Sequence, residues 1–231
     1  MTGALFSYAL LAALATALLV AALTDLRRRQ IDNGLNLCIA AGAPLWWLAA
    51  GFGFAEIGVQ LALAAAAFVV ASLLFARGQM GGGDVKLLVA LALWFTPARY
   101  LQVIVLMAVL GGGASFAMAA CNMKRVPGET LRDIVAGVVA LAWIGCAGAI
   151  VVAVATQRPV IGGTALSALA RLLPGASLAV AALVAIAAAV AAFVFGFRHI
   201  MRRQKSPIEV PYGVAIAAAG LWVIGAHTLP G

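Results

Sequence analysis

The composition of this 231-residue chain excludes a water-soluble fold: 65% of its residues are hydrophobic and only 10% are charged, against about 25% charged in an ordinary soluble domain. The formal net charge is +8, but the basic residues fall in short clusters between apolar runs instead of forming the single stripe of a nucleic-acid-binding protein. We therefore expect an all-α polytopic membrane protein embedded in a lipid bilayer, with no nucleic-acid partner.

Eight apolar stretches are predicted to be helices, judged against the roughly 20 apolar residues that span a hydrocarbon core. They cover residues 5–24, 35–52, 57–76, 86–96, 100–121, 133–156, 176–197 and 210–227. The fourth helix is short, because its apolar run stops before Pro97. We expect it either to lie beneath a thinned or water-filled part of the structure, or to join the next helix through a break at Pro97.

The distribution of Lys and Arg between alternate loops predicts the orientation in the membrane. Of the 15 basic residues, 3 fall on one side, namely Arg99, Arg158 and Arg171. The other side collects 12: Arg27, Arg28, Arg29, Arg77, Lys86, Lys124, Arg125, Arg132, Arg198, Arg202, Arg203 and Lys205. This split predicts that both termini lie in the periplasm and that the first, third, fifth and seventh loops lie in the cytoplasm.

The chain has only seven acidic residues, and five of them suit ordinary positions at helix ends or in loops. Asp133 and Glu209 stand at the starts of predicted helices, where the positive end of the helix dipole favours an anion. Glu56 is expected in a short external turn and Glu129 in a polar loop, and Asp32 can be treated as a loop or helix-end charge.

Asp25 and Asp84 are placed differently. Asp25 falls at the C-terminal end of the first helix, where the dipole disfavours a negative charge; Arg28 or Arg29 could neutralise it, but an ionisable group at membrane depth more often marks a functional site. Asp84 follows a run of three glycines and opens the fourth helix. It could be a plain N-cap, or the glycines could let a peptide backbone approach its carboxylate.

Both aspartates are expected at the cytoplasmic ends of their helices. Two carboxylates at one depth would share a proton, so the ionised one could take a proton from water while the protonated one polarises a peptide carbonyl. This aspartic-protease chemistry needs no metal and no cofactor. Lys86 could pair with Asp84 or with a substrate terminus, or be one more cytoplasmic lysine.

Three segments carry a family resemblance. Residues 81–86, GGGDVK, resemble the GxGD signature of intramembrane aspartic proteases, and the longer GGGDVKLL is similar to type IV prepilin peptidases. Residues 25–33, DLRRRQIDN, resemble that family's motif D-x-R-x-x-x-I-P-N, with Asp32 in place of the proline. Residues 211–217, PYGVAIA, are similar to the start of the last helix in its short, tight-adherence (Flp) pilus branch.

The resemblance implies a single peptidase domain over residues 1–231 in the bacterial inner membrane, with Asp25 and Asp84 as the catalytic pair and Gly81, Gly83 and Lys86 supporting the site. Its substrate would be a prepilin whose basic leader is cut at the cytoplasmic face, after a glycine and before an apolar helix. The cysteine-rich domain that accompanies N-methyltransferase activity is missing, so methylation is not expected. Residues 133–197 form two additional predicted helices, which could dock pilus-assembly machinery.

Three alternatives remain open at this stage. A presenilin-like protease would use the same carboxylates, although those relatives usually have tyrosine where Thr24 precedes Asp25 here. A proton-coupled transporter would be expected to carry broken helices in both halves. A non-catalytic pilus-assembly subunit would tolerate loss of either aspartate.

Overall fold

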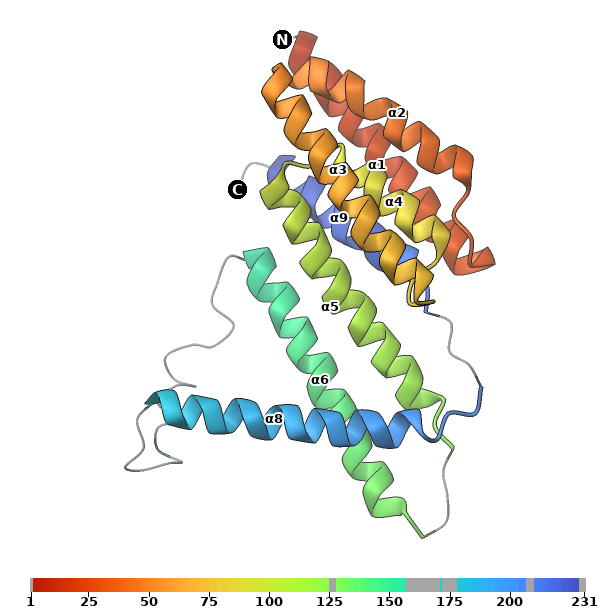
Figure 1. Ribbon diagram of the computed structural model, residues 1–231, viewed down its shortest axis with the longest axis vertical. Coiled ribbons are helices and arrows are strands. Elements are labelled where there is room, and N and C mark those ends of the chain that lie inside the picture. Colours follow the sequence, from red (N-terminus) through yellow and green to blue (C-terminus); the bar gives the residue numbers. More distant parts are fainter. Residues whose placement is uncertain (1, 125–127, 157–170, 172–177, 207–209, 229–231) are drawn as a thin grey trace. The chain divides into compact units, whose positions relative to one another are not determined.

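A computed structural model describes residues 2–124, 128–156, 171, 178–206 and 210–228 of the protein (Figure 1). Arg125, Arg158 and Glu209, which entered the sequence-based predictions, lie outside the described residues. Within that range the chain forms eight helices and no strand, which confirms the all-α prediction. The helices are α1 (Thr2–Arg28), α2 (Asn33–Ala50), α3 (Phe54–Ala76), α4 (Gly82–Ala92), α5 (Pro97–Cys121), α6 (Thr130–Thr156), α8 (Leu178–Met201) and α9 (Tyr212–Thr228).

The length and apolarity of the helices indicate a multi-pass membrane protein. In the described part of the chain, α1, α3, α5, α6 and α8 are long and apolar enough to cross a bilayer. By contrast, the 11 residues of α4 extend only about 16 Å, roughly half of the hydrocarbon core. In length this helix falls short of a full membrane span, and the predicted number of crossings remains a prediction.

The chain divides into two compact units. The first combines Met1–Gly111 with Pro211–Gly231, and the second is Gly112–Val210. Helix α5 contributes its first part to the first unit and its end to the second.

In the first unit, the short helix α4 is the buried centre. It packs against α2, α3 and α9, while α1 packs against α2 and α9 (Figure 1). Leu87 and Leu91, one turn apart on α4, are fully buried, as are Leu18 on α1 and Ile216 on α9. A helix that is largely apolar belongs in an interior, and this one places Asp84, in its first turn, among the surrounding helices.

The chain breaks between α4 and α5, as predicted at Pro97. The helix interruption leaves carbonyl oxygens without partners inside the helix, which is costly away from water. Side chains of neighbouring helices satisfy them: Trp47 Nε1 donates to the Leu93 oxygen at 2.8 Å, and Gln60 Nε2 donates to the Phe95 oxygen at 3.1 Å. Pro97 then begins α5, where its missing N–H costs nothing.

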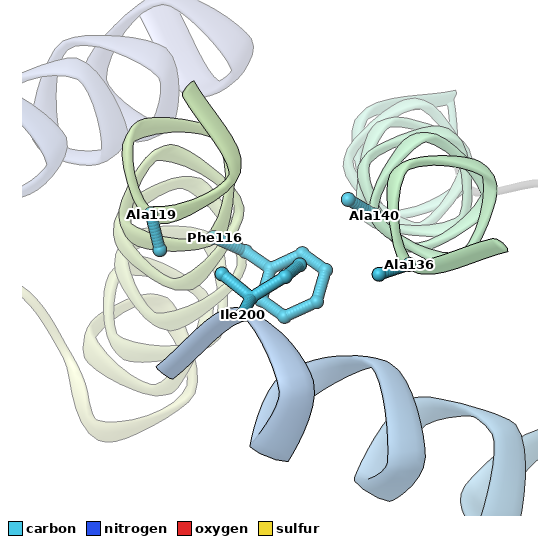
Figure 2. Close-up of a cluster of buried hydrophobic side chains, with 5 residues drawn as sticks. All are labelled: Phe116, Ala119, Ala136, Ala140 and Ile200. Atoms are coloured by element: carbon cyan, nitrogen blue, oxygen red, sulfur yellow. The ribbon is translucent and has the colours of Figure 1, made fainter. Parts of the chain in front are cut away.

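In the second unit, α6 packs against α8. Figure 2 shows the buried cluster, in which Phe116 and Ile200 lie close to the small side chains Ala119, Ala136 and Ala140. Small residues allow helices to approach closely, which drives association where lipid supplies no hydrophobic force. The two extra helices predicted within residues 133–197 thus correspond to α6 and α8.

A charge cluster joins the first turn of α6 to the end of α8. Asp133 lies 2.8 Å from His199 Nε2 and 3.2 Å from Arg203, and Arg203 also pairs with Glu129. An acid at a helix start and basic groups at a helix end each complement the helix dipole. Asp133 therefore has the helix-start position expected of it.

Two other acidic residues, Glu56 and Asp32, also lie at helix starts. Glu56 was predicted in an external turn, and this is wrong: it is the third residue of α3, and its carboxylate accepts the backbone N–H of Gly53. Asp32 caps α2 by accepting the N–H of Gly34 at 3.0 Å. Both are ordinary uses of an acid in the first turn of a helix.

Candidate active site

Asp25 lies in the last turn of α1, and its side chain is only 6% exposed. The helix ends just beyond it, where Arg29 adopts a positive φ of 54° and donates its backbone N–H to the Asp25 carbonyl at 2.9 Å. A left-handed residue at this position is the usual way for a helix to stop. The chain can then turn directly into the Asp32 cap of α2.

Asp84 is also buried, with 8% of it exposed, but it is not the N-cap that the sequence allowed. The cap is Gly81, and Asp84 is the third residue of α4, with its Oδ2 accepting the Gly81 N–H at 3.2 Å. The carboxylate therefore reaches back over the first turn of its own helix. Burial first, and the negative charge of Asp25 second, raise the pKa of Asp84 to about 6, while the hydrogen bond from the Gly81 N–H opposes the rise.

The glycine run brings α4 against the segment that follows Asp25. A Cβ on Gly83 would lie 3.2 Å from the Cβ of Ile31 and 3.4 Å from its backbone N and O. In addition, Asn36 Nδ2 donates to the Gly83 oxygen at 3.2 Å. The backbone that approaches Gly83 is thus the chain's own, whereas the sequence pattern had indicated a peptide substrate.

Lys86, expected to pair with Asp84 or with a substrate terminus, donates instead to Asn33 Oδ1 at 2.7 Å. This bond joins the fifth residue of α4 to the first residue of α2. The segments 25–33 and 81–86, which were recognised as separate sequence patterns, therefore interlock through Gly83 and Lys86. Gly81 has a local role, because its N–H is the donor to Asp84.

The third segment, at the start of α9, closes on Asp25. Val214 donates its backbone N–H to Asp25 Oδ2 at 3.2 Å. A Cβ on Gly213 would lie 2.8 Å from that same oxygen and 2.7 Å from Ile31 Cδ1. Sequence reasoning assigned no site role to Gly213, although its place at the start of the PYGVAIA segment was a signal that could have found it.

Among the described residues, Asp25 and Asp84 are the two acidic side chains that are buried. The other described acids cap helix starts or form the charge cluster of the second unit. In the same part of the chain, no three His, Cys, Asp or Glu side chains gather as metal ligands. The first unit thus brings together the ends of three sequence segments around a pair of buried carboxylates.

Residues 12–118 match the type IV leader peptidase family. Over this range the chain resembles that family. Comparison with curated proteins and with solved structures gave no significant match. The matched range contains both buried aspartates and ends before the additional helices of the second unit.

The match to the type IV leader peptidase family supports a protease activity and a prepilin as the substrate. The family resemblance deduced from GGGDVKLL and DLRRRQIDN is thereby confirmed, whereas its tight-adherence branch is not tested. Two buried carboxylates of which one is hard to ionise are able to act as base and acid in peptide hydrolysis.

Proposed function

We propose that the protein is a membrane aspartic endopeptidase that removes the basic leader from type IV prepilins of the Flp type, with Asp25 and Asp84 as its catalytic pair. The observation that carries the proposal is the coupling of two buried carboxylates: burial and the charge of Asp25 raise the pKa of Asp84 to about 6. A capping carboxylate has no need of such a neighbour, whereas an acid–base pair depends on it.

The pair would act by holding one proton between two carboxylates. The ionised carboxylate takes a proton from water while the water oxygen forms a bond to the scissile carbonyl carbon. The protonated carboxylate donates a hydrogen bond to the carbonyl oxygen, which carries the developing negative charge. The C–N bond then breaks and the leaving nitrogen takes up a proton, so that water is divided between the two products.

The substrate would be a precursor with a basic leader, a glycine and then an apolar helix. Its helix can enter the bilayer while the leader stays at the cytoplasmic face. The predicted orientation puts the C-terminal end of α1 and the start of α4 at this face. We propose no methylation of the new N-terminus, because the three cysteines of the sequence are scattered along it and form no cluster. Mass spectrometry of the processed pilin checks this point, and a methyl group added by the purified protein would contradict it.

The test of the catalytic pair is cleavage of a prepilin by Asp25→Asn and Asp84→Asn variants of the full chain. Asparagine keeps the size and the hydrogen bonds of aspartate but cannot exchange a proton. Each variant should lose processing while inserting at normal abundance. The double variant should be no worse than either single one, since residues that act as one unit are non-additive.

Asp32→Asn and Glu129→Gln are the matched controls. Asp32 caps α2, and Asn is nearly equal to Asp as a cap; Glu129 lies in the second unit. Both should retain substantial activity. Processing that survives Asp25→Asn or Asp84→Asn would remove the case for an aspartic pair and favour the transporter or the assembly subunit.

The cytoplasmic location of the site rests on the distribution of basic residues between loops. Reporter fusions at Gln204 and at Gly231 test it. Gln204 should report the cytoplasm and Gly231 the periplasm. Equal signals from the two fusions would contradict the proposed orientation.

A further inference from the structure

We propose that the first turn of α9 is part of the catalytic apparatus: Gly213 is a positioning residue that lets this turn hold the Asp25 carboxylate through backbone N–H groups, which makes Asp25 the base of the pair. The inference rests on the proposed function. It gives a role to the PYGVAIA segment, which the family match over residues 12–118 does not include.

Position 213 has too little room for a side chain. A Cβ there would lie 2.8 Å from Asp25 Oδ2, 2.9 Å from its Cγ and 2.7 Å from Ile31 Cδ1. Real Cβ contacts essentially never fall under 3.0 Å, so a side chain would have to displace something. The end of the Ile31 side chain can rotate away. The carboxyl group of Asp25 has less freedom to move, because it is only two bonds from the backbone. A larger residue at 213 would therefore push the carboxylate off α9.

The first turn of α9 also supplies backbone hydrogen-bond donors to the Asp25 carboxylate. Gly213 and Val214 are the second and third residues of α9, where backbone N–H groups lack a partner four residues back. Val214 donates to Asp25 Oδ2 at 3.2 Å while also sharing its hydrogen with the Pro211 oxygen, and the neighbouring Gly213 N–H also favours the ionised carboxylate. Hydrogen bonds to the charged form of a carboxylate favour that form, and so does the positive end of a helix.

This contact compensates for the position of Asp25 on its own helix. At the C-terminal end of α1 the helix dipole opposes a negative charge. The start of α9 offsets this, because it provides a backbone N–H donor and the positive end of its own dipole. The charged groups that act on Asp25 are Arg29 beyond the end of α1 and Asp84 on α4. Arg29 favours the ionised form of Asp25, whereas burial and the negative charge of Asp25 make Asp84 harder to ionise.

The experiment compares Gly213→Ala with Gly225→Ala in the full-length protein. Both add one methyl group to α9, but a Cβ on Gly225 meets nothing within 4 Å. The readouts are kcat, KM and the pH profile of kcat/KM for cleavage of a synthetic prepilin peptide, together with the thermal midpoint in detergent.

Gly213→Ala should lower kcat by about 100-fold, the cost of roughly 1 Å of misplacement, with little change in KM. The acidic limb of the profile should move to higher pH, because a carboxylate without its donors is harder to ionise. Gly225→Ala should match the wild type. A wild-type kcat for Gly213→Ala, or a lower kcat with an unmoved acidic limb, would overturn the proposal.

A second pair of variants keeps the test decisive if Gly213→Ala folds poorly. Ile31→Ala removes the 2.7 Å contact and leaves the contact with Asp25, so Gly213→Ala combined with Ile31→Ala should fold as well as Ile31→Ala alone yet remain about 100-fold slower. Equal activity of these two variants would show that Ile31, not Asp25, requires the glycine.

An active Asp25→Asn would instead refute the proposed function, whereas an inactive Asp25→Asn beside a normal Gly213→Ala would refute only this inference.

Discussion

Gly83 and Ile31 are in such close contact that a Cβ on the glycine would lie 3.2 Å from the Cβ of Ile31 and 3.4 Å from its backbone N and O. The contact joins the helix that carries Asp84 to the segment that follows Asp25. Two of the three atoms belong to backbone, which cannot rotate away as a side chain can. The relative placement of the two carboxylates therefore depends on the absence of a single methyl group.

Gly83→Ala should destabilise the protein and lower cleavage together. Overpacking of this kind costs about 1–3 kcal/mol, and any shift of α4 moves Asp84 with it. The thermal midpoint in detergent and the rate of prepilin cleavage measure the two effects. Gly58→Ala is the control, because a Cβ there meets nothing within 4 Å; equal behaviour of the two variants would contradict the steric role of Gly83.

The bond between Lys86 and Asn33 predicts a specific coupling. Because it is an exposed hydrogen bond, Lys86→Met and Asn33→Ala should each cost about 1 kcal/mol or less. The double variant should be less unstable than the sum of the single ones, as expected for residues in contact. Chemical denaturation of the four proteins measures this cycle. Additive losses, with a large rise in KM for Lys86→Met alone, would show that Lys86 binds substrate instead.

Asp84 makes stability depend on pH. Its pKa is raised from 3.8 to about 6 in the folded protein, so the folded state binds the proton more tightly than the unfolded state does. Below about pH 4 both states are protonated and burial carries no charge penalty; stability is then lost as the pH rises to about 6.

Asp84→Asn does not titrate and should escape this loss. Relative to the wild type, it should gain on the order of 2–3 kcal/mol between about pH 4 and pH 6, at about 1.4 kcal/mol per pKa unit. The difference between the two thermal midpoints, measured over this range, checks the prediction. A constant difference would contradict it.

The charge cluster of the second unit should contribute to stability and not to cleavage. Asp133→Asn weakens its contacts with His199 and Arg203, which are only partly exposed, and should cost about 1–3 kcal/mol. Arg132→Gln is the control, since Arg132 is 67% exposed and its pair with Glu129 is 3.8 Å long, a surface contact worth about 1 kcal/mol or less. Loss of cleavage in a folded Asp133→Asn variant would place part of the site in this unit.

The sequence by itself determined the features that are recorded locally along the chain. Apolar runs of sufficient length predict membrane helices because the bilayer leaves backbone groups no other partner, and Pro97 predicts a break because it cannot donate within a helix. Asp25 was conspicuous for the same local reason, as an acid at the unfavourable end of a helix. These signals need no knowledge of what each helix packs against.

Only the tertiary structure decided which groups meet at the aspartates. Val214 donates to Asp25 across a separation of 189 residues, and nothing in the hydropathy of α9 indicates which neighbouring carboxylate its first turn will face. The same is true of Gly83 and Gly213. The sequence shows that these positions have no side chain, but it does not show which neighbouring atoms occupy that space. Ile31 contacts both positions, and that meeting depends on how α1, α4 and α9 pack, which is set by contacts between helices and not by the pattern within any one of them.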